Sequence, residues 1–275
     1  MKLNRGSLIG VGLVSFFIII AVLSPLIAPH AYDQIFEGAL KLPAFWQEGG
    51  SRAFLLGTDD LGRDLLSRLI YGAPVSLGIG FAVVIFATII GTFLGLLAGT
   101  LRGWVDVVLS RLMDIILALP SMLMAIVVIA ILGPSVKNTV LAVGIVSIPQ
   151  IFRVIRATAL VEMSKNYVVA IQTFGGSWWR VAIRNVLPNC VAPLIVQATL
   201  GLSDAILNAA ALGFLGLGAQ PPLPEWGTML SDARSFIESS PWMVTLPGLC
   251  ILLVVIGFNL LGDALRDHLD PRLKR

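Results

Sequence analysis

The stretch NYVVAIQTFGGSWWRVAIRNVLPN, Asn166 to Asn189, is a polar and basic segment between two long apolar runs. Apolar residues at one-turn spacing precede Gly175-Gly176, and a second amphipathic segment runs from Trp178 to Leu187 and stops at Pro188. This pattern predicts two short helices joined by a glycine turn. Two arginines four residues apart share a face of the second helix. A protruding helix pair of this kind indicates a docking element for a partner protein.

The spacing of this stretch resembles the cytoplasmic loop of the inner-membrane permease subunits of ABC importers. That loop is written EAA, three residues, Gly, nine residues, Ile, one residue, Leu-Pro, and its short helix presses into a groove on an ATPase subunit. Val169-Ala170-Ile171, Gly175 and Leu187-Pro188 fall at these spacings. The chain departs from the family at the first and third residues of the triplet, where the family has Glu and Ala, and at Asn185, where it has Ile.

The resemblance implies that part of this loop couples transport to the ATPase. The residues to which it assigns this ATPase-coupling role are Tyr167, Val169, Ala170, Ile171, Gly175, Gly176, Arg184, Leu187 and Pro188. The apolar face that carries Tyr167, Ala170 and Ile171 is expected to insert into the ATPase subunit. Gly175 is expected to adopt a turn conformation that a side chain would disfavour.

Three further segments resemble signatures of the dipeptide, oligopeptide and nickel permease family, and of its C-type subunit in particular. They are LGTDDLGRDLLSRLIYGAPVSLGIG (Leu56 to Gly80), ALGFLGLGAQPPLPEWGTML (Ala211 to Leu230) and FNLLGDALRDHLDPRLK (Phe258 to Lys274). Together with the loop they span nearly the whole chain in the expected order. Within the family, the chain is most similar to dipeptide permeases.

The resemblance implies the type I ABC importer permease fold and an ATP-driven importer, in which this chain forms half of the translocation pathway for dipeptides or short peptides. The same architecture could instead import nickel or another small solute. The implied partners are a second permease subunit in a heterodimer, two cytoplasmic ATP-binding subunits and an extracytoplasmic peptide-binding protein. Membrane lipid surrounds the chain, and no nucleic-acid partner is expected. No cofactor is expected on this chain, whereas ATP and Mg are expected on the partner ATPase subunits.

The composition independently indicates an all-α polytopic membrane protein. Of the 275 residues, 57% are hydrophobic and 13% charged, and the mean hydropathy is +0.91. Soluble domains have a charged fraction of about 25%. Cys190 and Cys250 both lie in apolar runs, so neither suggests a disulfide framework or a metal site. No metal site is predicted.

Six apolar runs predict six transmembrane helices, because a helix of about 20 residues crosses a bilayer core of roughly 30 Å. The runs are Leu8 to Ile27, Val75 to Leu101, Val105 to Leu132, Val140 to Ile155, Cys190 to Leu217 and Met243 to Leu261. The first is read as an uncleaved span that starts inside the cell. Both termini and the Asn166 to Asn189 loop are then cytoplasmic, in a bacterial inner membrane.

The distribution of cations supports this topology. Of the 19 Lys and Arg residues, only six fall outside, and the other 13 fall inside, as the positive-inside rule requires. The six are Lys41, Arg52, Arg63, Arg68, Lys137 and Arg234.

The chain therefore divides into four parts. Residues 1–28 form the N-terminal transmembrane helix, and residues 29–73 an extracytoplasmic segment with an interfacial helix. Residues 74–264 form the importer transmembrane domain, with five helices and a coupling loop over residues 162–189. Residues 265–275 form a cytoplasmic tail.

Two local patterns add detail to these parts. Asp60 is expected to cap the interfacial helix, with leucines on one side and Arg63, Asp64 and Arg68 on a solvated side. In the second span, glycines at positions 91, 95 and 99 leave one face bare, which predicts close packing against another helix.

Charged residues at membrane depth are candidates for function, because they are costly to bury there. Asp114 and Asp263 each lie three residues from an arginine, Arg111 and Arg266, and are expected to pair with it on their own helix. Asp204 has no cation nearby in the sequence. It either lines a water-filled path or has a buried, hydrogen-bonded role.

Ser203, Asp204 and Asn208 are therefore the candidate residues of a translocation path. No catalytic residue is predicted, because the chain lacks GxxxxGK[ST], HExxH and GxSxG. The remaining enzyme class is an intramembrane aspartyl protease, since Leu261-Gly262-Asp263 is one residue short of GxGD and Asp114 could supply the second acid. A self-sufficient channel or secondary transporter would need internal repeats or a dense polar lining, and the sequence shows neither.

Overall fold

The structure is a computed structural model that describes residues 5–269, and within that range it contains helices and no β-strand. The α-helices are α1 (Arg5–Ile27), α2 (Leu65–Leu101), α3 (Gly103–Ala118), α4 (Ser121–Leu132), α5 (Val136–Glu162), α6 (Asn166–Thr173), α7 (Trp178–Arg180), α8 (Leu187–Phe214), α9 (Trp226–Ala233) and α10 (Trp242–Leu269). A π-helical turn, Val181–Val186, joins α7 to α8, and a 3-10 turn, Arg234–Phe236, follows α9.

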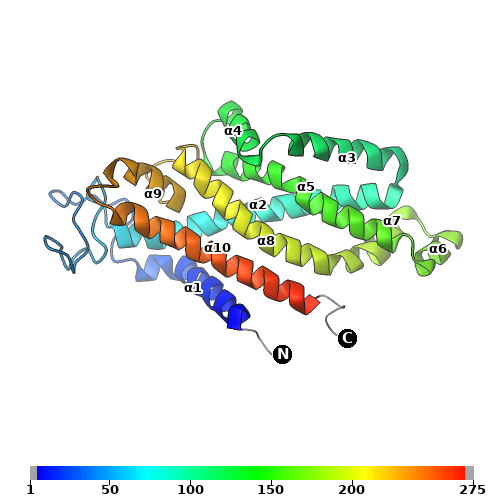
Figure 1. Cartoon of the computed structure of the whole chain (residues 1–275), viewed down its shortest axis with the longest axis horizontal. Coiled ribbons are helices and arrows are strands. Elements are labelled where there is room, and N and C mark those ends of the chain that lie inside the picture. The colour runs from blue at the N-terminus through cyan, green and yellow to red at the C-terminus, as the bar shows by residue number, and fades with distance from the viewer. Residues whose placement is uncertain (1–4, 270–275) are drawn as a thin grey trace.

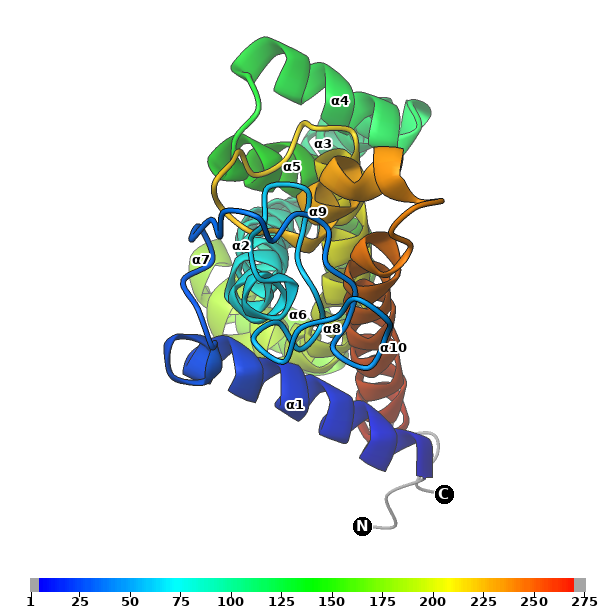
Figure 2. The same ribbon diagram turned by 90° about the vertical axis from the view of Figure 1, so that its left-hand side faces the viewer.

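The long helices α2, α5, α8 and α10 run along the long axis of the molecule (Figure 1). Helix α6 lies at one end of this bundle, and α9 lies at the other with the loops of residues 28–64. These two ends are called the α6 end and the α9 end below. Helix α1 packs obliquely on α10 (Figure 2), where a side chain on Gly10 would come within 2.8 Å of the Leu260 Cβ. The start of α1 and the end of α10 both point toward the α6 end.

The number of predicted spans agrees with the structure. Within residues 5–269, five helical segments are long and apolar enough to cross a membrane, and α3 with α4 makes a sixth if the bent pair is counted as one span. The span predicted from Val105 to Leu132 is not one continuous helix, because the chain turns by 91° between α3 and α4. The break falls at Leu119 and Pro120, whose backbones are extended. Proline disfavours helical geometry in the residue before it, which accounts for the position of the break.

The predicted end of the second amphipathic segment at Pro188 is also wrong. Trp178–Phe214 forms one apolar helical segment of 37 residues that passes through the π-helical turn. Pro188 is the second residue of α8 and directly follows the π-helical turn, so the helix continues past this proline.

The predicted interfacial helix does not exist as a separate element. Asp64, not Asp60, caps α2, and its side chain accepts a hydrogen bond from the Ser67 N–H. Helix α2 then continues without a break to Leu101. Arg63 and Arg68 were expected on a solvated side, but both are buried. The Nε atoms of Arg63 and Arg68 lie 2.6 Å and 3.4 Å, respectively, from Asp59 Oδ2. The two arginines therefore share one carboxylate inside the α9 end.

Residues 270–275 of the predicted cytoplasmic tail lie outside the described residues, and so does Lys2. The part of the tail that the structure describes, residues 265–269, continues α10.

The glycine face of the second span packs on α5. A Cβ atom added at Gly91, Gly95 or Gly99 would come within 2.6 to 2.9 Å of the Cβ atoms of Ile151, Ile155 and Ala159, respectively. The prediction of close helix packing is confirmed, and α5 is the partner helix.

Gly95→Leu is expected to destabilise the protein by about 1–3 kcal/mol or more, because the new side chain would push α2 off α5. Gly78→Leu is the matched control: Gly78 lies on the same helix, and its added Cβ would meet nothing within 4 Å. Thermal unfolding of the purified protein in detergent measures the difference. Equal melting temperatures for the two variants would contradict the packing argument.

Candidate functional site

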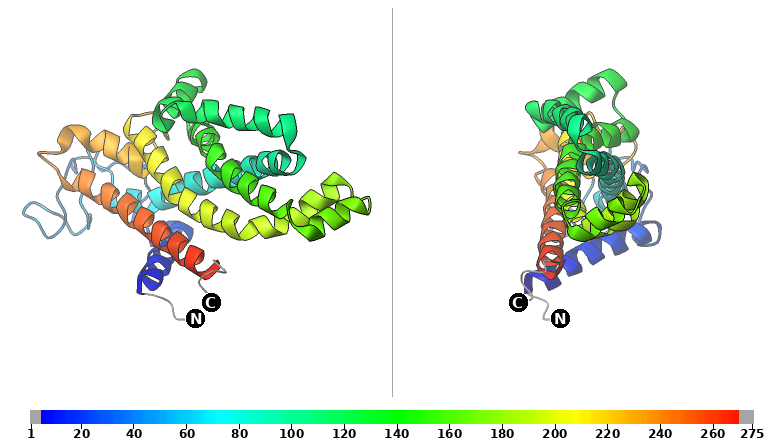
Figure 3. Two further views of the ribbon diagram at one scale, coloured as in Figure 1. Left: turned by 45° about the vertical axis from the view of Figure 1, so that its right-hand side comes forward. Right: turned by 90° about the vertical axis from the view of Figure 1, so that its right-hand side faces the viewer.

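The α6 end carries a protruding helical tip. Helix α6 projects beyond the ends of the long helices (Figure 3) and ends at a turn in which Gly175 has φ +82°. This is the left-handed region that glycine enters without strain, so the prediction for Gly175 is confirmed. A side chain at Gly176 would clash with Ile171, which closes the turn against α6. Arg184 is exposed, in the π-helical turn.

One face of α6 packs on the bundle, and no other part of the described chain, residues 5–269, covers the opposite face. Val168 is 0% exposed and belongs to an apolar cluster with Val181 and Val186, against which Ile171 and Leu187 also pack. The exposed apolar and aromatic residues are Tyr167, Val169, Ala170 and Phe174. Ile171 therefore contributes mainly to the attachment of α6, and less to the outer surface than was expected.

The most exposed apolar side chain of this tip is one that the sequence reasoning did not select. Phe174 is 90% exposed, although a phenyl ring in water is unfavourable. The signal in the sequence was a large aromatic residue directly before the glycine turn. An apolar tip of this kind is typical of a surface that is covered in an assembly.

A polar cluster fixes α6 to the two long helices beside it. Glu162, the last residue of α5, accepts hydrogen bonds from Lys165 Nζ at 2.5 Å and from the Tyr167 hydroxyl at 2.8 Å. Asn189 Nδ2 of α8 donates to the same hydroxyl at 3.3 Å. Burial, with the hydrogen bond to Glu162, raises the pKa of Tyr167. A displacement of α6 would therefore reach both α5 and α8 through Glu162, Tyr167 and Asn189.

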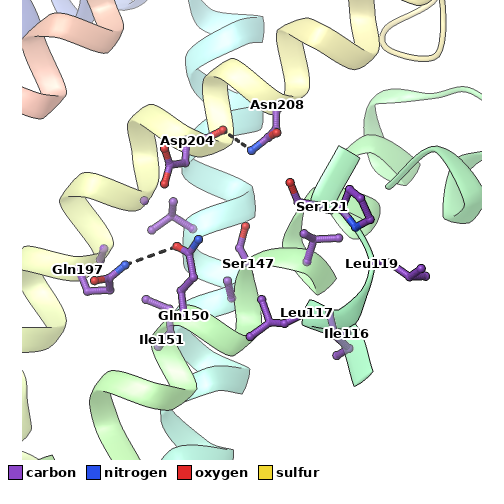
Figure 4. Close-up of a pocket in the computed structure, with 16 residues that line it drawn as sticks. Ile116, Leu117, Leu119, Ser121, Ser147, Gln150, Ile151, Gln197, Asp204 and Asn208 are labelled. Carbon is purple, nitrogen blue, oxygen red and sulfur yellow. Dashed lines mark hydrogen bonds between the residues drawn. The ribbon is translucent and has the colours of Figure 1, made fainter. Parts of the chain in front are cut away.

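A second site lies deeper in the bundle, where α2, α5 and α8 meet the break between α3 and α4. A cavity of about 470 Å³ opens there. Its polar lining residues are Ser121, Ser147, Gln150, Gln197, Asp204 and Asn208 (Figure 4). The bend that interrupts the third span thus brings the α3–α4 connection to the wall of a polar cavity.

Two of the three predicted path residues line this cavity. Asp204 and Asn208 lie one turn apart on α8, and Asn208 Nδ2 donates to the Asp204 carbonyl at 2.8 Å. Within residues 5–269, no cation forms a salt bridge with the Asp204 carboxylate. Ser203 is 2% exposed, and its hydroxyl donates to the Val255 carbonyl of α10 at 3.3 Å. Ser203 therefore joins two helices and does not belong to the cavity wall.

Gln150 and Gln197 are the cavity residues that sequence reasoning missed. They come from α5 and α8, and Gln197 Nε2 donates to Gln150 Oε1 at 3.5 Å across the cavity (Figure 4). Uncharged polar residues in apolar runs gave a weaker signal than Asp204, and only the packing of α5 against α8 brings the two side chains together.

The other intramembrane acids have different surroundings. Asp114 lies 3.7 Å from Arg111, as predicted, and 3.1 Å from Arg153 of α5. Asp263 forms no salt bridge within the part of the chain that the structure describes, so the predicted pair with Arg266 is not formed. Two arginines neutralise Asp114, whereas a protease dyad needs two carboxylates that share a proton. This arrangement argues against an aspartyl protease.

The chain matches two family models. Residues 91–275 match the family described as "Binding-protein-dependent transport system inner membrane component". Residues 1–44 match the "N-terminal TM domain of oligopeptide transport permease C".

Curated relatives cover nearly the whole chain. The dipeptide transport system permease protein DppC of Haemophilus influenzae is 50% identical over 274 residues, which are 100% of this chain and 93% of the relative. The di/tripeptide transport system permease protein DppC of Pseudomonas aeruginosa is 53% identical over 271 residues, 98% of this chain and 89% of the relative. The probable D,D-dipeptide transport system permease protein DdpC of Escherichia coli is 43% identical over 260 residues, 94% and 85% of the two chains.

A solved structure shows the same fold. A chain of the inward-facing MetNI methionine ABC transporter superposes with a TM-score of 0.62 at 16% identity, covering 75% of this chain and 98% of that one. The type I importer permease fold is thereby confirmed. With two family matches and full-length relatives at about 50% identity, this multi-pass chain belongs to the family of binding-protein-dependent transport system inner membrane components, as a C-type ABC importer permease.

Proposed function

We propose that this chain forms half of the path by which an ATP-driven importer moves dipeptides or short peptides across the bacterial inner membrane. The observation that carries the substrate class is the identity of 50 to 54%, over nearly the whole chain, to permeases named for dipeptides or di- and tripeptides. The cavity supports the proposal, because its single carboxylate and its carboxamides suit a peptide with a cationic amino terminus.

An ABC importer permease works with ATP-binding and substrate-binding partners. In this proposal the chain pairs with a second, similar permease subunit as a heterodimer. Two cytoplasmic subunits bind ATP and Mg, and an extracytoplasmic binding protein delivers the peptide. This chain binds no cofactor of its own.

The proposed topology places the α6 end in the cytoplasm, with both termini, and the α9 end outside. The exposed tip of α6, residues Tyr167, Val169, Ala170 and Phe174, is the proposed docking face for an ATPase subunit. Closure of the ATPase subunits would push this tip, and the Glu162 cluster would pass the displacement to α5 and α8. Because these two helices carry Gln150 and Asp204, the push would change access to the cavity.

Asp204→Asn is expected to lower peptide uptake at least tenfold, because the uncharged amide attracts the amino terminus of a peptide far less than a carboxylate does. The measurement is the uptake of radiolabelled alanyl-alanine by cells in which the variant is the only copy of this subunit. The amount of assembled complex is determined on the same membranes.

Asp263→Asn is the matched control, since it makes the same change on α10 at a carboxylate that does not line the cavity. It should transport like the wild type. If Asp204→Asn prevents assembly, Asp204 has a structural role and its assignment to the path is wrong. If wild-type cells take up no alanyl-alanine, the proposed substrate class is wrong.

A further inference from the structure

Gln150 and Gln197 are joined by a hydrogen bond that is easily replaced. Their side chains point toward each other from α5 and α8 (Figure 4), and the Nε2–Oε1 distance is 3.5 Å. Amide hydrogen bonds are commonly 2.7–3.2 Å long, so this one is weak. The pair can separate at little cost when another donor or acceptor enters between the two side chains.

The pair also has hydrogen-bonding capacity that the protein does not use. Each carboxamide has two N–H donors and an oxygen that accepts twice, and one bond is all that the two side chains make within residues 5–269. By contrast, the nearby Ser147 hydroxyl donates to the Val143 carbonyl of its own helix at 2.8 Å. Unsatisfied polar groups at membrane depth are costly, so the free amide atoms must face water or a polar solute.

The position of the pair places it after Asp204 on the way to the α6 end. Gln197 precedes Asp204 by seven residues, which corresponds to two helical turns or about 10 Å along α8. Around the glutamines the cavity wall is apolar, with Ile116, Leu117 and Ile151. A solute that moves from Asp204 toward the α6 end therefore meets two carboxamides between mainly apolar side chains.

We infer that Gln150 and Gln197 form a gate that recognises the peptide bond of the passing substrate. A carboxamide presents the same donor and acceptor as a peptide group, so each glutamine can exchange its bond to the other glutamine for one to the substrate's N–H or C=O. This recognition does not depend on side chains, and it favours peptides over a metal ion or a single amino acid. The inference rests on the proposed function and adds a selectivity step to it.

The test compares two substrates in cells that contain the full transporter. Alanyl-alanine has a peptide N–H, and alanyl-lactate has an ester oxygen in its place but the same charged termini. The variants are Gln150→Met and Gln197→Met, which replace the carboxamide by an apolar chain of similar length. Thr199→Val is the control, because Thr199 lies on α8 outside the cavity wall and its hydroxyl donates to its own helix at Ile195.

The measured quantity is the ratio of alanyl-alanine uptake to alanyl-lactate uptake, compared between each variant and the wild type. The binding protein is the same in all the strains, so any preference it has for one of the two substrates affects every ratio equally and does not change the comparison between variant and wild type. Each Met variant is expected to lower alanyl-alanine uptake about three- to tenfold and to lower the ratio at least about threefold, as the loss of a hydrogen bond predicts. Thr199→Val should leave both values unchanged.

An unchanged ratio in both Met variants, with normal wild-type uptake, would overturn the gate and leave the proposed function intact. Absence of alanyl-alanine uptake in the wild type would overturn the proposed function and the gate with it. If a Met variant does not assemble, the Asn variant at the same position replaces it, because asparagine keeps the amide but withdraws it by one methylene group. That variant is also expected to lower the ratio, and an unchanged ratio would contradict the gate.

Discussion

Ala170→Glu is expected to abolish peptide uptake while leaving the protein in the membrane. Ala170 lies on the outward side of α6, beside Tyr167, Val169 and Phe174, and its replacement does not disturb the buried contacts of Val168. If this face inserts into an ATPase subunit, the new carboxylate becomes buried without a partner, which costs several kcal/mol. That cost is enough to weaken a modest interface by more than a hundredfold. Uptake and co-purification of the ATPase subunits are measured on the same membranes.

Ala170→Ser is the control for this experiment, because serine is small and uncharged. It should transport and retain the ATPase subunits as the wild type does. Phe174→Ala should weaken co-purification less than Ala170→Glu, since it removes apolar contact area without adding a charge. Normal uptake together with normal co-purification in Ala170→Glu would show that α6 is only a connection between two spans.

The membrane spans could be predicted from the sequence because they depend on local composition. The break in the third span could not be predicted in the same way. Proline did not mark it uniquely, since Pro25, Pro74, Pro149, Pro193 and Pro247 all lie inside continuous helices. Neighbouring helices can satisfy the backbone groups that a membrane proline leaves free, so whether a helix kinks or breaks is decided by tertiary packing.

The start of α2 could not be predicted from the sequence for a different reason. Asp60 and Asp64 are both suitable helix caps, and both precede the same leucines. The choice depends on Gly62, whose φ of +80° turns the chain between them, and on the burial of Arg63 beside Asp59. These features depend on how the loop folds, so the spacing of apolar residues in the sequence cannot show which aspartate caps the helix.

The sequence identified only some of the cavity residues, because it does not show which way each side chain points. Asp204 stood out because it is a charge in an apolar run, but Ser203 was grouped with it only through its neighbouring position. Adjacent residues of a helix point about 100° apart, so Ser203 faces α10 while Asp204 faces the cavity. Gln150 and Gln197 are 47 residues apart, and their pairing follows from the packing of two helices.

Glu225→Ala is expected to lower the free energy of unfolding by about 2–4 kcal/mol, because Glu225 caps α9 from a fully enclosed position. The side chain is buried, and its carboxylate accepts hydrogen bonds from the N–H groups of Gly227 and Thr228 at 2.8 Å and 2.9 Å and from the Ser76 hydroxyl of α2 at 3.3 Å. Alanine would leave two buried N–H groups without an acceptor. Glu238→Ala, at an exposed position in the same region, should have little effect, and thermal unfolding in detergent measures both variants.

The same residue predicts a pH dependence of stability. Burial raises the pKa of the Glu225 carboxyl, although the N–H groups of Gly227 and Thr228 and the Ser76 hydroxyl act to lower it. An acid with a raised pKa in the folded state binds its proton more tightly there than in the unfolded chain. Its contribution to stability is therefore greatest below the ordinary carboxyl value of about 4.3 and declines as the pH rises toward the raised value. Glu225→Gln should remove this decline, so the stability difference between wild type and variant should become less favourable to the wild type with rising pH. A difference that does not change with pH would show that folding leaves the pKa of the Glu225 carboxyl unchanged, and would contradict the prediction.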